Sequence, residues 1–232
     1  MKIKEDFVEG IFIKESKNRF ICTVLIESKP HECYVASASK LKNYLNMNGK
    51  KVLLVKINKI ESKMKYRLFA VEYYNQYIIL DLLFVNRILE EYLKAKYFED
   101  VIKREGCFEG YKSDFLILGN SNIVVEAKGI IAMKKNIKFP TVFSKRAIDQ
   151  LHHILKFLKD GIKVHYYLIS LSPIVKSIKI NDELMFKEYT DLLMQCINEG
   201  MVLSGFNIIL RDNEVKINKK LKMVDSNNYI IF

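Results

Sequence analysis

The chain has 232 residues, of which 50% are hydrophobic and 28% are charged, so it can bury one medium-sized core or two small ones. Its formal net charge is +11. Nine glycines, three prolines and 12% aromatic residues exclude a collagen-like chain and argue against disorder. These numbers predict a folded, basic protein.

The sequence predicts a cytoplasmic protein with no membrane partner. No apolar stretch reaches the roughly 20 residues that a membrane-spanning helix needs, and the amino terminus carries charges of both signs instead of a signal peptide's apolar run. The four cysteines show no CxxC pair and no histidine at zinc-finger spacing. We expect them to be buried thiols in a reducing compartment, without structural zinc.

Residues 1–80 are predicted to form an OB-like barrel that binds nucleic acid. Five segments mix β-branched or aromatic residues with polar ones, and turn residues separate them, as in short strands. Five strands with one small helix fit a Greek-key barrel of the OB kind. The predicted strands are 7–15, 18–28, 31–37, 50–60 and 65–74, with one or two helical turns within 37–46.

Residues 81–232 are predicted to form a mixed-sheet α/β domain, which makes the whole chain α/β (α+β). Apolar spacing predicts helices at 86–97, 144–159 and 182–199, the second capped by Ser144. Strands are predicted at 163–171 and 205–210, and a hairpin pairs 114–118 with 122–127. Helices that alternate with strands in this way are typical of an α/β sheet.

The basic charge is concentrated in the first domain, with +7 on residues 1–80 and +4 on residues 81–232. The stretch 50–67 has seven basic residues and one acidic residue. Phosphate backbones attract such a surface, and the neighbouring rings of Tyr66 and Phe69 are suited to base stacking. The alternative is a solvated lysine-rich face. The candidate nucleic-acid contacts here are Lys51, Lys63, Lys65 and Arg67.

Three ionisable residues of the predicted hairpin could perform chemistry. Asp114 begins the first strand, and Glu126 and Lys128 point to one face of the second because strand side chains alternate. If Asp114 lies opposite them, two carboxylates can hold Mg²⁺ or Mn²⁺, which polarises a phosphodiester while Lys128 orients the attacking water or stabilises developing charge. The alternative is that Glu126 and Lys128 face solvent on an edge strand and pair with each other.

The segment after this hairpin is suited to holding a phosphate chain. Residues 133–146 contain five basic residues and no acid, including Lys134, Lys135 and Arg146. Gln150 follows Arg146 by one helical turn, on the same face of the predicted helix.

Seven short motifs follow one another along the chain: Asn18-Arg19-Phe20, Met64-Lys65-Tyr66, Phe84-Val85-Asn86-Arg87, Ser113-Asp114-Phe115, Val125-Glu126-Ala127-Lys128, Phe139-Pro140 and Ser144-Lys145-Arg146. In this order they resemble the sugar fermentation stimulation protein A family over nearly the whole chain. The resemblance implies an OB-like barrel followed by a PD-(D/E)XK nuclease-like domain, and DNA binding.

Position by position, the resemblance assigns Asp114, Glu126 and Lys128 to the nuclease triad. It also matches Glu91 to an acidic position on the first helix of the second domain, and we include Glu91 with Asp114 and Glu126 as an expected metal ligand. Lys112 falls where the family has an arginine just before its aspartate.

Arg146 falls on the family's arginine after Phe-Pro, but three positions depart from the pattern. The family's Pro-Asn-Thr-Gly stretch is replaced by Ala-Ser-Ala-Ser at 36–39, its acid after Phe-Pro by Thr141, and its helix histidine by Gln150. Glutamine recurs at this helix in the wider nuclease superfamily, and none of the departures removes an expected metal ligand.

We therefore predict a two-domain DNA-binding protein with a metal-dependent nuclease site. The alternative is a non-catalytic DNA-binding regulator, of sugar-metabolism genes by the family resemblance, that keeps the nuclease scaffold. Charge and stacking do not separate single-stranded DNA from RNA as the partner. The sequence also leaves open whether the protein is a monomer or a homodimer.

Overall fold

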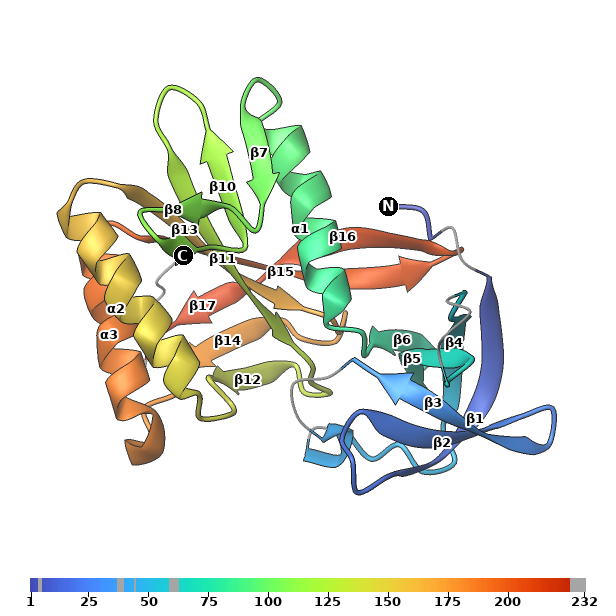
Figure 1. Ribbon diagram of the computed structural model, residues 1–232. Coiled ribbons are helices and arrows are strands. Elements are labelled where there is room, and N and C mark those ends of the chain that lie inside the picture. The colour runs from blue at the N-terminus through green and yellow to red at the C-terminus, as the bar shows by residue number, and fades with distance from the viewer. Residues whose placement is uncertain (4–5, 37–39, 44, 59–62, 226–232) are drawn as a thin grey trace.

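The computed structural model describes residues 1–3, 6–36, 40–43, 45–58 and 63–225. A β-barrel built from the amino-terminal strands lies beside a larger domain of sheet and helices (Figure 1). Within these ranges no helix combines the length and the apolar character needed to cross a membrane.

The predicted OB-like barrel is confirmed. Five strands pair in the order β3-β2-β1-β4-β5, and a parallel pairing of β3 with β5 closes the ring. The predicted helical turns are described only as the short helix η1 (Leu41–Asn43), because residues 37–39 and 44 lie outside the described ranges, as do residues 59–60 of the predicted fourth strand. The strands are β1 (Phe7–Glu15), β2 (Ile21–Ile26), β3 (Lys29–Val35), β4 (Lys51–Lys56) and β5 (Tyr66–Tyr73), and β6 (Gln76–Ile79) extends the sheet beyond β5.

The predicted mixed α/β sheet is also confirmed. Six strands lie in the order β16-β15-β13-β11-β10-β7, and β11, β13 and β15 at its centre are parallel. The strands are β7 (Val101–Arg104), β10 (Phe115–Leu118), β11 (Ile123–Ile130), β13 (Lys163–Ser170), β15 (Val202–Arg211) and β16 (Glu214–Lys220). The helices are α1 (Leu83–Lys96), α2 (Lys145–Lys159) and α3 (Lys187–Asn198).

Several short elements were not predicted from the sequence. A three-stranded parallel sheet joins β12 (Asn136–Phe139), β14 (Ser177–Ile180) and β17 (Lys222–Val224), and β8 (Cys107–Phe108) pairs with β9 (Tyr111–Lys112). The third predicted helix begins late, because Leu184–Phe186 form the short helix η2 before α3. Three cysteines are buried as expected, whereas Cys107 is exposed, and all four are free thiols.

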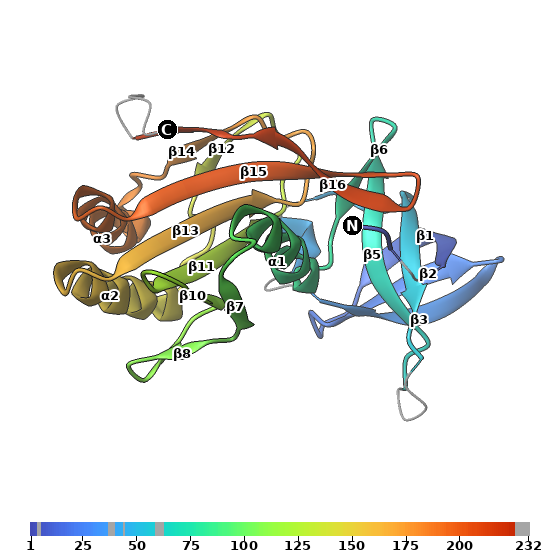
Figure 2. The same ribbon diagram turned by 90° about the horizontal axis from the view of Figure 1, so that it is seen from above.

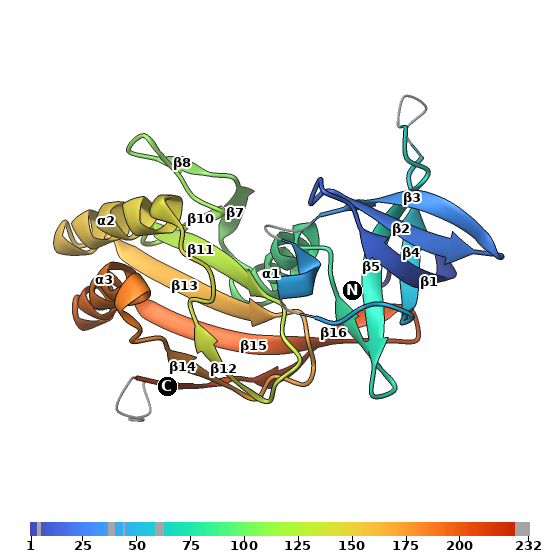
Figure 3. The ribbon, with the colours of Figure 1, turned by 90° about the horizontal axis from the view of Figure 1, so that it is seen from below.

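The two faces of the central sheet pack against different partners. Val125 and Ile169 on one face join a core with α1 and the barrel, whereas Val124 and Leu168 on the other face join a core with α2, α3 and the small sheet. Figures 2 and 3 show the β15–β16 hairpin reaching from this sheet toward β6 beside the barrel.

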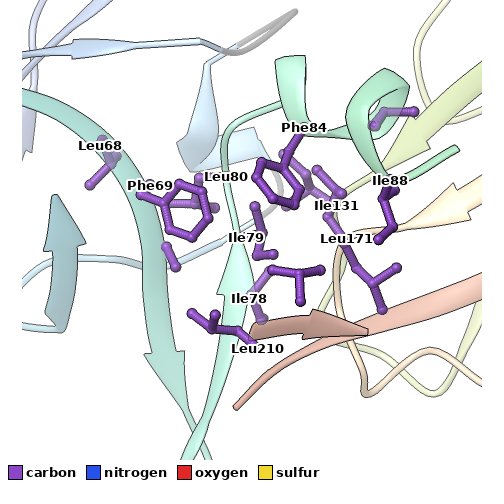
Figure 4. Packing of buried hydrophobic residues seen from close by; sticks show 14 of the residues in the cluster. Leu68, Phe69, Ile78, Ile79, Leu80, Phe84, Ile88, Ile131, Leu171 and Leu210 are labelled. Carbon is purple, nitrogen blue, oxygen red and sulfur yellow. The ribbon is translucent and has the colours of Figure 1, made fainter. Parts of the chain in front are cut away.

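The barrel and the α/β domain share one apolar core at their junction. Figure 4 shows Phe69 and Ile79 from the barrel side meeting Phe84 of α1 and Leu171 after β13. The rings of Phe69 and Phe84 lie edge to face with centroids 5.5 Å apart, and the amide of Ile79 donates a hydrogen bond to the carbonyl of Leu171 at 2.9 Å. The sequence boundary at residue 80 therefore falls within a continuous core.

Phe84→Ala tests this shared core. Phe84 is 2% exposed, so its truncation should leave a cavity and lower the free energy of unfolding by about 3–5 kcal/mol. Urea unfolding should be followed by one probe in the barrel and one in the α/β domain. Both probes should still report a single transition, because the two domains lose the same contacts. Phe98→Ala, at a 79% exposed ring, is the control and should change stability by less than about 0.5 kcal/mol. A barrel that unfolds separately from the sheet would contradict the prediction.

Candidate active site

The register of β10 and β11 brings Asp114 to Glu126. Phe115 pairs with Val125 across the two antiparallel strands, so Asp114, one residue before β10, lies opposite Glu126. The Oδ2 atom of Asp114 accepts a hydrogen bond of 2.9 Å from the backbone N–H of Ala127. The carboxylate is therefore held against β11 by the backbone of that strand.

Glu126 is the buried member of the site, with only 1% of its surface exposed. The Tyr111 hydroxyl donates to its Oε1 at 2.6 Å, and the side chains of Lys128 and Gln150 each donate to its Oε2 at 3.2 Å. Burial raises the pKa of Glu126, and the charge of Asp114 raises it further, while Lys128 acts in the opposite direction.

The alternative interpretation of the hairpin is right about the ion pair between Glu126 and Lys128 but wrong about an exposed edge strand. The ion pair between Glu126 and Lys128 is present, with 3.2 Å between Nζ and Oε2. However, β11 is a central strand between β10 and β13, and Glu126 is buried instead of facing solvent.

Lys128 connects this buried carboxylate to the surface. Its side chain is 23% exposed, and its Nζ donates to Oε1 of Gln150 at 2.8 Å and lies 5.7 Å from the centre of the Tyr166 ring. Gln150, on α2, thus contacts both Lys128 and Glu126 and fixes the position of the ammonium group.

Asn86 on α1 is a site residue that the sequence analysis did not identify. Its side-chain amide donates to Oδ1 of Asp114 at 3.1 Å. The close approach of α1 depends on Gly129 of β11, where an added Cβ would lie 2.6 Å from Cγ2 of Val85 and 2.8 Å from Cδ2 of Leu82. In the sequence, Asn86 is marked only by its place in the family-like motif Phe84-Val85-Asn86-Arg87, to which no functional role was assigned.

The expected role of Glu91 as a metal ligand is not supported by its position. Five residues after Asn86, it points about 140° away around the helix. Its Oε2 lies 3.5 Å from the amino group of Met1, and its side chain is 52% exposed. Glu91 therefore does not join Asp114 and Glu126.

Tyr111 is a second site residue that was missed, because its two-residue strand β9 has no detectable periodicity. Burial and the nearby Glu126 raise the pKa of its hydroxyl, so the group stays protonated and donates to the carboxylate.

A cavity of about 450 Å³ opens beside these residues. Asp114, Lys128 and Gln150 line one part of it, and Glu126 lies behind them, outside the lining. The remaining lining comes mainly from the start of α1, the loop between β12 and α2, and the start of α3. These other residues include Leu82, Val85, Asn86, Phe139, Pro140, Thr141, Val142, Phe143, Ser144, Arg146, Phe186 and Tyr189.

The amino terminus of α2 faces this cavity. Ser144 caps the helix as predicted, because its Oγ accepts a hydrogen bond of 3.2 Å from the N–H of Ala147. The first turn contains Lys145 and Arg146 and no acidic residue. The helix dipole makes this end of α2 electropositive, and no acidic side chain in the first turn offsets it. Lys145 and Arg146 add to the positive potential.

Among the other predicted nucleic-acid contacts, some lysines are exposed and others form ion pairs at the surface. Lys63, Lys65, Lys134 and Lys135 are exposed. Lys51 pairs with Glu9 at 2.7 Å and Lys112 with Glu105 at 2.5 Å, at the surface.

Arg67, a predicted nucleic-acid contact, uses its charge inside the protein. Its side chain is 20% exposed, and its Nε lies 3.0 Å from Oδ2 of the buried Asp81. Because Asp81 precedes α1, this ion pair joins β5 of the barrel to the start of the α/β domain.

The carboxylates present fit a hydrated hard cation. The part of the chain that the structure describes has no group of three or more His, Cys, Asp or Glu side chains that could hold a metal. Asp114 and Glu126 are two carboxylates close enough for the charge of Asp114 to raise the pKa of Glu126. Mg²⁺ is commonly held by one or two carboxylates while keeping several waters, so two are sufficient.

Two family models match this chain, one for each domain. Residues 83–214 match the family described as "Sugar fermentation stimulation protein RE domain", and residues 15–80 match the "SfsA N-terminal OB domain".

Relatives that match over most of their length support the same relationship. A sugar fermentation stimulation protein homolog from Desulfitobacterium hafniense is 25% identical over 216 residues, covering 90% of this chain and 92% of the relative. A homolog from Clostridium kluyveri is 25% identical over 231 residues, covering 96% and 99%. The solved structure of Pyrococcus furiosus SfsA in complex with Ca²⁺ has the same fold, with a TM-score of 0.81, 21% identity and coverage of 96% and 99%. Since the RE-domain match spans more than half of the sequence, the chain belongs to the sugar fermentation stimulation protein family.

Proposed function

We propose that this protein is a cytoplasmic nucleic-acid-binding hydrolase that cleaves phosphodiester bonds, with DNA as its main partner. The observation that carries the proposal is the convergence of Asp114, Lys128 and Gln150 at one cavity wall, with the buried Glu126 hydrogen-bonded to Lys128 and Gln150 behind them. Two carboxylates, an ammonium and an amide in this arrangement correspond to the PD-(D/E)XK pattern that the sequence resembles.

Asp114 and Glu126 are the residues that would hold Mg²⁺ or Mn²⁺. A bound divalent cation would polarise the scissile phosphate and make a water molecule more acidic. The related protein from Pyrococcus furiosus is described in complex with Ca²⁺, another cation that binds oxygen ligands. Tyr111 and Asn86 support the two carboxylates by donating hydrogen bonds to them.

Lys128 would stabilise the negative charge that develops on the phosphate during hydrolysis. Its Nζ is fixed by Glu126 and Gln150 and lies at the cavity, so little reorganisation is needed when that charge appears. Arg146 and the amino terminus of α2 supply positive potential for the same phosphate chain.

A non-catalytic nucleic-acid-binding regulator is the second candidate. The ion pair between Lys128 and Glu126 favours it, since the ammonium of Lys128 satisfies the buried carboxylate without a metal ion. The two candidates share the cavity and the basic residues and differ only in whether cleavage occurs.

Lys128→Ala tests the catalytic proposal. We expect cleavage of labelled DNA to fall by about 100-fold or more, because the charge that stabilises the transition state is lost, while DNA affinity changes little. Single-stranded DNA, duplex DNA and RNA would each be incubated with Mg²⁺, Mn²⁺ or EDTA. Lys156→Ala, at an exposed residue in the last turn of α2, is the matched control and should cleave like the unmodified protein.

Two results would reject this proposal. One is cleavage by Lys128→Ala at the unmodified rate. The other is salt-sensitive binding to nucleic acid without cleavage under any metal, which would identify the protein as a regulator.

The pKa of Glu126 should respond to its two charged neighbours in opposite directions. Asp114→Asn removes a negative charge and should lower this pKa, whereas Lys128→Gln removes a positive charge and should raise it. In the unmodified protein, cleavage should decline as the pH falls through this raised pKa, because a protonated Glu126 cannot hold a cation. Carbon-detected NMR of the glutamate carboxyl groups, without metal, measures the pKa. Lys156→Gln should leave it unchanged, and a shift of the same sign in both site variants would disprove the assigned electrostatics.

A further inference from the structure

Exposed apolar side chains occur in two segments that border the cavity, the loop between β12 and α2 and the short helix η2. Val142 and Phe143, in the loop between β12 and α2, are 46% and 52% exposed. Leu184 and Met185, in η2, are 87% and 59% exposed. Each segment contributes one residue to the lining of the cavity, Phe143 from the loop and Phe186 from η2. A cluster of exposed apolar groups beside ionised side chains indicates a binding surface.

Phe143 differs from the other rings of this cavity. Phe186 and Tyr189 are each 5% exposed, and Phe139 packs edge to face on Tyr189 with ring centroids 6.0 Å apart. Those rings belong to the packed wall, whereas half of the Phe143 side chain faces solvent. Phe143 therefore offers an aromatic face to a ligand that enters the cavity.

The charges around Phe143 indicate what that ligand is. Arg146 follows three residues later and lines the same cavity, so a flat apolar group and a phosphate can be held together. An apolar segment of a partner protein, or of a second copy of this chain, would cover Arg146 without pairing its charge, which is costly. A nucleotide satisfies both features, because its base stacks on aromatic rings and its phosphate pairs with cations.

We propose that Phe143 is a base-stacking residue and that the site takes an unpaired nucleotide, in a single strand or at an unpaired position of a duplex. This inference rests on the proposed function of the same site. In a paired duplex each base is stacked between its neighbours, so Phe143 can reach a base face only where pairing and stacking are broken. The cavity of about 450 Å³ lies within the range of pockets that enclose one small ligand.

The test compares binding of a short labelled single strand with binding of its duplex, by fluorescence anisotropy in EDTA so that no cleavage interferes. Phe143→Ala should weaken single-strand binding about tenfold and change duplex binding little, since removing one stacking ring affects only an unpaired base. Phe143→Trp should keep the affinity. Phe98→Ala, at an exposed ring near the far end of α1, is the control and should bind like the unmodified protein.

A second series uses single strands that each lack one base. The unmodified protein should lose about tenfold in affinity when one particular base is missing, and Phe143→Ala should lose little at that position. The inference is overturned if Phe143→Ala binds single strands like Phe98→Ala, weakens single strands and duplexes equally, or loses as much as the unmodified protein when that base is missing.

Cleavage by the same variants in Mn²⁺ separates this inference from the proposed function. A protein that cleaves nucleic acid but does not respond to Phe143→Ala keeps the proposed function and loses the stacking residue. A protein that shows the stacking response without cleaving keeps Phe143 as a binding residue and loses the catalytic proposal.

Discussion

The antiparallel pairing of β10 with β11 aligns Phe115 with Val125 and thereby sets the geometry of the whole site. A shift of one residue would turn the side chains of one strand to the opposite face, and Asp114 would no longer meet Glu126. The side chain of Asp114 also stabilises this register, because its carboxylate accepts a hydrogen bond from the backbone N–H of Ala127 on β11. Asn86 and Gln150 then approach from α1 and α2, so a local pairing in the sheet organises contacts from both of its faces.

The network around Glu126 shows how the fold accommodates a buried carboxylate. An ionised carboxylate without partners in the interior costs several kcal/mol, so its burial is tolerated only with good hydrogen bonds and a nearby opposite charge. Tyr111, Lys128 and Gln150 supply three donors. The pKa of Glu126 is nevertheless raised, which means that the burial and the charge of Asp114 outweigh these donors. A pKa displaced in this way, next to a cavity, is typical of a functional site.

The parts of the fold that follow from local patterns could be predicted, and those that depend on long-range contacts could not. Strand alternation placed Glu126 and Lys128 on one face, and the Ser144 cap fixed the start of α2. The rotation of α1 relative to the sheet is set by packing, so the sequence alone could not show that Asn86 points to the site and Glu91 away from it. The β12-β14-β17 sheet was missed because its strands have three or four residues each and pair with partners about 40 residues away.

The core shared by the barrel and the α/β domain also determines what would happen if the chain were divided. A cut between β6 and α1 would leave Ile79 on one fragment and Phe84 on the other, each with its apolar surface exposed to water. Exposed apolar patches of this kind favour aggregation. Exchanging the barrel for that of a distant relative would meet the same obstacle, because both sides of the junction must change shape together. The two halves of this molecule are therefore expected to be inherited, and to be studied, as a single unit.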